Sequence, residues 1–103
     1  MVRASLVIFA VALALSTFCA GQSAADVYKA KCAACHGTGG AGDTTVGRNM
    51  KVRDLSSDDV QKQSDAELTT IIKNGKGKMP KYEGKLTDQQ ITDLVKYIRT
   101  LKK

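Results

Sequence analysis

The sequence is poor in the residues that usually fill a protein core. It contains no tryptophan, and only 5% of its 103 residues are aromatic. It also has a single histidine and a single proline. A chain of this length forms at most one small domain, and at this size a core of side chains alone is marginal. We therefore expect that something other than side chains occupies part of its interior.

The first 25 residues have the composition of a secretory signal. Arg3 is followed by a long apolar run, and small residues then continue to Ala25. The positions after Gly21 and after Ala25 both satisfy the small-residue rule for cleavage. We predict a signal peptide at 1–25, export to a bacterial periplasm and a mature domain at 26–103.

Two other fates of this segment are weighed against cleavage. A membrane anchor would depend on the uncharged run at 4–20, which has 17 residues, whereas a span needs about 20 apolar residues. Lipid attachment at Cys19 is disfavoured by the large side chain of Phe18 before it. Both are less favoured than cleavage.

The mature chain has two cysteines, Cys32 and Cys35, and His36 follows them directly. Their spacing is too local for a disulfide that would staple a whole domain. A zinc site needs about four protein ligands, and the chain offers no second pair of this kind. A thioredoxin-like redox pair needs strands that alternate with helices, and the sequence predicts no strand.

The remaining interpretation of the motif is attachment of a c-type haem. Two cysteines one helical turn apart can form thioethers with the two vinyl groups at one edge of a porphyrin. The next residue along, a histidine, can then bind the iron at one face of the porphyrin. The motif predicts one covalent haem c, attached through Cys32 and Cys35 and ligated by His36.

Two capping boxes mark helix starts later in the chain. Ser64 with Glu67 opens a helix that Gly75 ends, and Thr87 with Gln90 opens the last helix. The apolar residues of the two helices recur at helical spacing: Leu68, Ile71 and Ile72 in the first, and Ile91, Leu94, Val95, Ile98 and Leu101 in the last.

An earlier helix is expected from Ala24 to about Cys35, and the glycine-rich segment at 37–42 ends it. Segment 43–60 is expected to be an ordered loop with a short helical turn from Ser57. The fold class is therefore all-α, with three to four short helices and long loops. Such long loops argue against an assignment unless they wrap a ligand, which agrees with one covalent haem.

The second axial ligand of the iron has two candidates, Met50 and Met79, because the chain has no second histidine and Met1 is the initiator. Met79 follows a loop with two glycines and precedes Pro80, which stiffens the chain. A thioether opposite a histidine favours ferrous iron and raises the reduction potential. We predict ligation by Met79, and packing in the haem pocket by Met50.

These residues together resemble the small class I monohaem cytochromes c of bacteria. The resemblance covers about 24–101, and its specific parts are Tyr28, the Cys-Ala-Ala-Cys-His-Gly motif, Lys78-Met79-Pro80, Leu94 and Tyr97. It implies the class I cytochrome c fold, in which the first and last helices cross beside the haem edge. The pair implied here is Ala24 and Tyr28 against Leu94 and Tyr97.

One departure from that family concerns the histidine. Many members have a proline after the haem motif, near the backbone carbonyl that accepts a hydrogen bond from the ligand histidine, but the only proline here is Pro80. Residues 44–47 are the candidates to supply that carbonyl. Such a bond would fix the orientation and basicity of His36.

Positive charge gathers around the predicted methionine ligand. The formal net charge is +6, and five lysines flank the loop, namely Lys73, Lys76, Lys78, Lys81 and Lys85. Such a face could steer an acidic redox partner onto the protein. The simpler alternative is a solvated basic face that keeps a small exported protein in solution.

The sequence thus predicts a soluble, monomeric one-electron carrier and no enzyme. Its partners would be larger redox proteins, such as a membrane quinol-oxidising complex and a terminal oxidase or reductase. Nucleic acid and small-molecule substrates are not expected. One alternative is a haem-based sensor or peroxidase-like protein with a displaceable sixth ligand, and the other is a haem-free redox or metal-binding domain.

Overall fold

The computed structural model describes residues 23–103, and the predicted signal sequence up to residue 22, with its anchor and lipid alternatives, lies outside the described residues. The described part is helical and has no strand, only isolated bridges such as the one between Lys76 and Met79. The predicted all-α class is confirmed. None of the described helices has both the length and the apolar character needed to cross a membrane.

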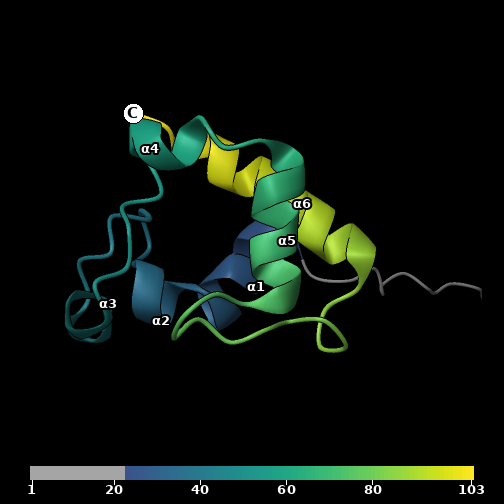
Figure 1. Ribbon diagram of the computed structural model, residues 1–103, viewed down its shortest axis with the longest axis horizontal. Coiled ribbons are helices and arrows are strands. Elements are labelled where there is room, and N and C mark those ends of the chain that lie inside the picture. The colour runs from purple at the N-terminus through teal and green to yellow at the C-terminus, as the bar shows by residue number, and fades with distance from the viewer. Residues whose placement is uncertain (1–22) are drawn as a thin grey trace, which may run out of the picture.

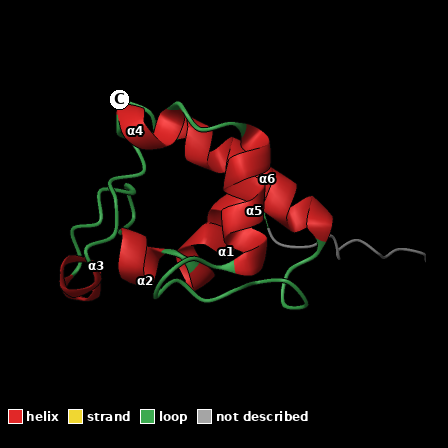
Figure 2. Cartoon of the chain, viewed as in Figure 1, coloured by secondary structure: helices red, strands yellow, loops and turns green. Residues whose placement is uncertain are grey.

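Six helices follow one another in the described chain (Figures 1 and 2). They are α1 (Ala24–Lys31), α2 (Ala33–His36), α3 (Thr45–Met50), α4 (Asp58–Gln61), α5 (Asp65–Asn74) and α6 (Asp88–Thr100). Helices α1 and α5 both pack against α6, and α2 packs against α3. In Figure 1 the long loops leave α3 at one end of the molecule, away from α6.

Side chains at the N-termini explain where most of these helices begin. The predicted boxes at Ser64 and Thr87 are both formed, with reciprocal hydrogen bonds between the cap and the third helical residue. Ser23, Thr44 and Ser57 cap three other helices with a single bond, in which the side-chain oxygen accepts from a backbone N–H. Each such bond satisfies a backbone N–H group that the helix leaves free.

Two local predictions are wrong in detail. The expected helix from Ala24 to about Cys35 is interrupted at Cys32, where φ is −116°, so α1 and α2 are separate. Segment 43–60, expected to be an irregular loop with one helical turn, contains α3 as well as α4. Helix α3 has an internal glycine and no apolar periodicity, so only its packing on α2 reveals it.

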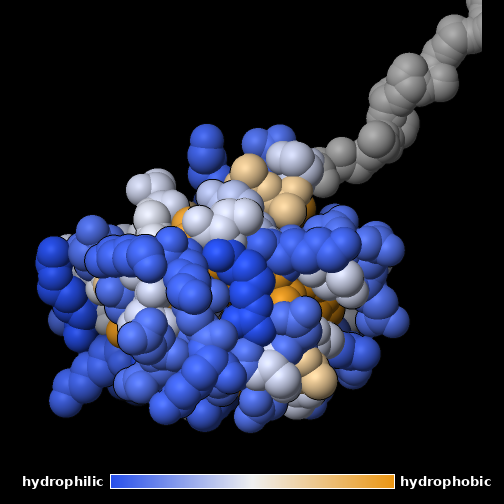
Figure 3. All heavy atoms as spheres, turned by 90° about the horizontal axis from the view of Figure 1, so that it is seen from above, coloured by the Kyte–Doolittle hydropathy of each residue, from blue (hydrophilic) through white to orange (hydrophobic). Residues whose placement is uncertain are grey.

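The core lies where α1, α5 and α6 meet. The buried apolar residues are Val27, Tyr28, Val60, Leu68, Ile72, Leu86, Ile91, Leu94, Val95 and Ile98. The Tyr28 and Tyr97 rings lie 5.0 Å apart at the crossing of α1 and α6, tilted by 44°. Polar residues cover most of the face seen in Figure 3, where apolar residues show only in small areas.

Candidate haem site

A cavity of about 320 Å³ opens between α2, α5, α6 and the loop after α5. Most of its wall is apolar, with side chains such as Leu55, Leu68, Ile72 and Leu94. Ligand pockets typically have this character and start at roughly this size. The thin core inferred from the sequence therefore corresponds to a real hollow in the structure.

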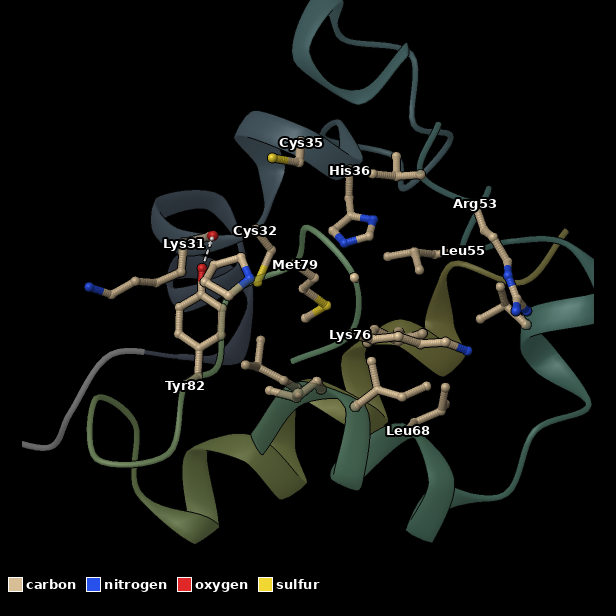
Figure 4. Close-up of a pocket in the computed structure, with 18 of the residues that line it drawn as sticks. Lys31, Cys32, Cys35, His36, Arg53, Leu55, Leu68, Lys76, Met79 and Tyr82 are labelled. Carbon is tan, nitrogen blue, oxygen red and sulfur yellow. Dashed lines mark hydrogen bonds between the residues drawn. The ribbon is translucent and has the colours of Figure 1, made fainter. Parts of the chain in front are cut away.

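All four predicted site residues line this one cavity. Cys32, Cys35 and His36 enter it from the junction of α1 and α2, and Met79 enters it from the loop after α5 (Figure 4). The His36 ring and the Met79 side chain point toward one another. Met50, predicted to pack in the pocket, is also part of the wall.

The break at Cys32 sets the geometry of the motif. The Cys32 carbonyl accepts hydrogen bonds from the N–H of Cys35 at 3.2 Å and of His36 at 2.9 Å. This single turn holds the two thiols and the imidazole on one short unit. Its end is fixed by the His36 carbonyl, which accepts a 2.7 Å hydrogen bond from the N–H of Gly42.

Helix α3 is seated directly on this unit. The Thr44 hydroxyl donates to the Cys35 carbonyl at 3.2 Å and accepts from the N–H of Gly47 at 2.8 Å. A β-carbon at Gly47 would overlap the Cys35 carbonyl oxygen. A residue without a side chain is therefore required here for α3 to approach α2.

The methionine is presented by a tight turn. Lys76 and Met79 exchange two backbone hydrogen bonds, of 2.9 and 3.2 Å. Gly75 has φ +77°, and a β-carbon there would lie 2.6 Å from the Met79 carbonyl oxygen. Gly75 is thus required by the loop's own backbone, a reason that the sequence does not reveal.

Burial controls the charge of the site. It lowers the pKa of His36, so the imidazole is neutral near neutral pH, as a metal ligand must be. Burial also raises the pKa of Cys32 to about 11, and the adjacent Cys35 adds to this. Both cysteines are free thiols.

The expected hydrogen bond that orients His36 is not formed. Its Nδ1 atom is buried and has no partner among residues 23–103. In the segment expected to supply the carbonyl, the Thr44 carbonyl accepts from the N–H of Arg48 and the Gly47 carbonyl accepts from that of Val52. These carbonyls serve the ends of α3 instead.

The residues present fit a haem. A neutral imidazole, a soft thioether and two nearby thiols border one apolar cavity, and among residues 23–103 no charged side chain is buried with them. Sequence reasoning missed Tyr82, which closes the wall near Cys32. No spacing or motif marks this tyrosine. The all-α fold and this cavity define the class of c-type cytochromes.

Comparison with known proteins gives the family. Residues 20–98 match the family described as cytochrome c oxidase, cbb3-type, subunit III. The chain is 35% identical to cytochrome c6 of Leptolyngbya boryana over 72 residues, 70% of this chain and 81% of that protein. It is 37% identical to cytochrome c6 of Bryopsis maxima over 79 residues, 72% and 83% of the two chains.

A solved structure, the KustC0563 c-type cytochrome, matches with a TM-score of 0.74 at 28% identity, over 80% of this chain and all of that one. The chain therefore belongs to this cytochrome c family, as a small class I monohaem cytochrome c. Its cofactor is a covalently bound c-type haem, and its function is electron transfer. The predicted fold, cofactor and general function are confirmed.

Proposed function

We propose that this cytochrome carries single electrons through a haem attached at Cys32 and Cys35, with His36 and Met79 as the axial ligands of its iron. The observation that carries the proposal is that two segments, centred 43 positions apart in the sequence at His36 and Met79, contribute these side chains to one apolar cavity. When bound, the haem supplies a one-electron ferric–ferrous couple.

The protein residues hold and tune that group. The thiols of Cys32 and Cys35 would form the two thioethers and fix one edge of the porphyrin. The neutral His36 imidazole and the Met79 sulfur would occupy both faces of the iron, so that few atoms move when its charge changes. The apolar wall excludes water, and the thioether favours the ferrous state.

The absent partner of His36 Nδ1 affects the potential. An imidazole that donates a hydrogen bond to a carbonyl is a more basic ligand and stabilises ferric iron. Without that hydrogen bond the His36 imidazole is a less basic ligand and gives less electron density to the iron. This favours the ferrous state further. We therefore expect a reduction potential toward the upper part of the range for such haems.

Partners and location follow from charge and from the N-terminal pattern. The lysine face, defined as Lys73, Lys76, Lys78, Lys81 and Lys85, includes two residues that border the cavity, Lys76 and Lys78, and it suits an acidic surface on a larger redox protein. The secretory pattern ahead of the domain suits export to the periplasm. A monomer that shuttles between a donor and an acceptor is consistent with both features.

Two measurements test this function. Haem stain that persists on a denaturing gel would support covalent attachment, and Cys32→Ser with Cys35→Ser should abolish it. The ferric protein should show the weak long-wavelength band of a methionine-ligated haem. Met79→Ala should lose this band, whereas the matched control Met50→Ala should keep it. A band that survives in Met79→Ala would show that another residue is the ligand.

A further inference from the structure

Tyr82 connects the methionine loop to the other wall of the cavity. Its hydroxyl donates a 3.0 Å hydrogen bond to the carbonyl of Lys31, 51 positions earlier (dashed line in Figure 4). Lys31 ends α1 and directly precedes Cys32. Tyr82 follows Met79 by three positions and lines the cavity with it. This bond therefore joins the segment that presents the methionine to the segment that attaches the haem.

The other restraints on this loop run to α5. The N–H of Tyr82 donates to the Ile72 carbonyl, and the N–H of Glu83 donates to the Lys73 carbonyl, both at 3.1 Å. These bonds fix the backbone after Met79 on one side. The Tyr82 hydroxyl acts across the cavity, toward α1, and so opposes movement of the loop away from the haem motif.

The surroundings of Tyr82 favour this role. The side chain is partly buried against the core, and burial, with smaller effects of Cys32 and Cys35, raises its pKa. The hydroxyl therefore stays protonated and can donate. On its outer side the Lys85 ammonium lies 5.9 Å from the ring centroid, where a cation–π attraction holds the ring in place.

We propose that Tyr82 is a positioning residue that keeps Met79 at the iron and thereby keeps external ligands out of the sixth position. The inference rests on the proposed ligation by Met79. An external ligand binds only when the loop has opened, so its apparent affinity scales with the open fraction. Loss of one hydrogen bond should raise that fraction about fivefold.

The test uses the full ferric protein with its haem and imidazole as the external ligand. Imidazole is titrated while the visible spectrum is followed, and the apparent association constant is compared between variants. Tyr82→Phe keeps the ring but removes the hydroxyl, and it should bind imidazole about fivefold more tightly than the wild type. An unchanged association constant would overturn the proposal.

Two controls separate this role from a loss of general stability. Tyr97→Phe also removes a hydroxyl, one that makes no hydrogen bond to residues 23–103, and Ser64→Ala removes the N-cap of α5, at the opposite end of that helix from the methionine loop. Both should bind imidazole as the wild type does. An equal increase in either variant would show that Tyr82 acts only through overall stability and would also overturn the proposal.

The ligation itself is checked separately with Met79→Ala. If its association constant for imidazole equals that of the wild type, Met79 does not guard the sixth position, and the proposed function fails together with the inference. If Met79→Ala binds more tightly while Tyr82→Phe does not, the ligation stands and only the role of Tyr82 is wrong.

Discussion

The Tyr28 hydroxyl donates a 2.6 Å hydrogen bond to the carbonyl of Gly37, nine positions later. Tyr28 lies on α1 and is only 2% exposed, while Gly37 is the residue at which α2 ends. The bond thus fixes the C-terminal end of the haem-attachment motif to α1. It also orients the chain directly after His36, while the tyrosine ring packs on Tyr97 of α6.

Removal of this hydroxyl should destabilise the protein. Tyr28→Phe keeps the ring but removes one of two donors to the buried Gly37 carbonyl, which still accepts from the N–H of Gly40 at 3.1 Å. We therefore expect the loss of a single hydrogen bond, about 1 kcal/mol. The measurement is the free energy of unfolding by guanidinium chloride, with haem bound. Tyr97→Phe is the matched control and should change the free energy of unfolding by less. Equal losses in both variants would mean that the Tyr28 hydrogen bond is not the cause.

Gly47 should tolerate no side chain. Gly47→Ala places a β-carbon onto the Cys35 carbonyl oxygen, so α3 must move away from α2 at a cost of about 2 kcal/mol. The melting temperature and the yield of haem-loaded protein should both fall. The control is Gly39→Ala, because a β-carbon there meets no atom within 4 Å. A wild-type melting temperature for Gly47→Ala would contradict the close packing of α3 against the Cys35 carbonyl.

This contact also explains what the sequence could and could not reveal. The capping boxes at Ser64 and Thr87 act within one helical turn, so both could be predicted from neighbouring residues in the sequence. The buried face of α6 could be predicted for the same reason, because its apolar residues recur at helical spacing within one short segment. Helix α3 could not be predicted in this way, because its position depends on the close approach of Gly47 to Cys35, a contact between segments that no local pattern encodes.

The site divides in the same way. The motif at Cys32 and the methionine at Met79 were recognisable as chemistry, and both line the cavity. The missing partner of His36 Nδ1 and the Tyr82 hydrogen bond to Lys31 depend on how loops meet in space. The missing proline left residues 44–47 as candidates for the carbonyl that orients His36, but it could not indicate that the Thr44 and Gly47 carbonyls accept hydrogen bonds at the ends of α3 instead.

The two predicted cleavage sites differ in what they would leave of the N-terminus of α1. Ser23 is the N-cap of α1, and its hydroxyl accepts a hydrogen bond from the N–H of Asp26. Cleavage after Ala25 would remove this cap, a loss of about 1 kcal/mol, whereas cleavage after Gly21 keeps it. We expect mass spectrometry of the mature protein to find Gln22 at the N-terminus. A mature chain that begins at Asp26 would contradict this expectation.

The lysine face should accelerate electron transfer with anions. Ferricyanide is a suitable probe because it is a small trianion that oxidises the ferrous protein without a specific docking site. Lys78 borders the cavity mouth, so Lys78→Gln should slow oxidation about threefold at low ionic strength, since it weakens the local positive potential. Stopped-flow absorbance measures the rate, and the long-wavelength band must be unchanged to show that Met79 is still bound.

Salt and position provide the controls for this last effect. At about 1 M salt the screening length falls to about 3 Å, so the difference between Lys78→Gln and the wild type should nearly vanish. Lys62→Gln removes the same charge from the residue that directly follows α4, where Lys62 pairs with Asp59 at 3.5 Å, and it should change the rate little. If both variants slow oxidation equally, net charge governs the encounter, and the lysine face only keeps the protein in solution.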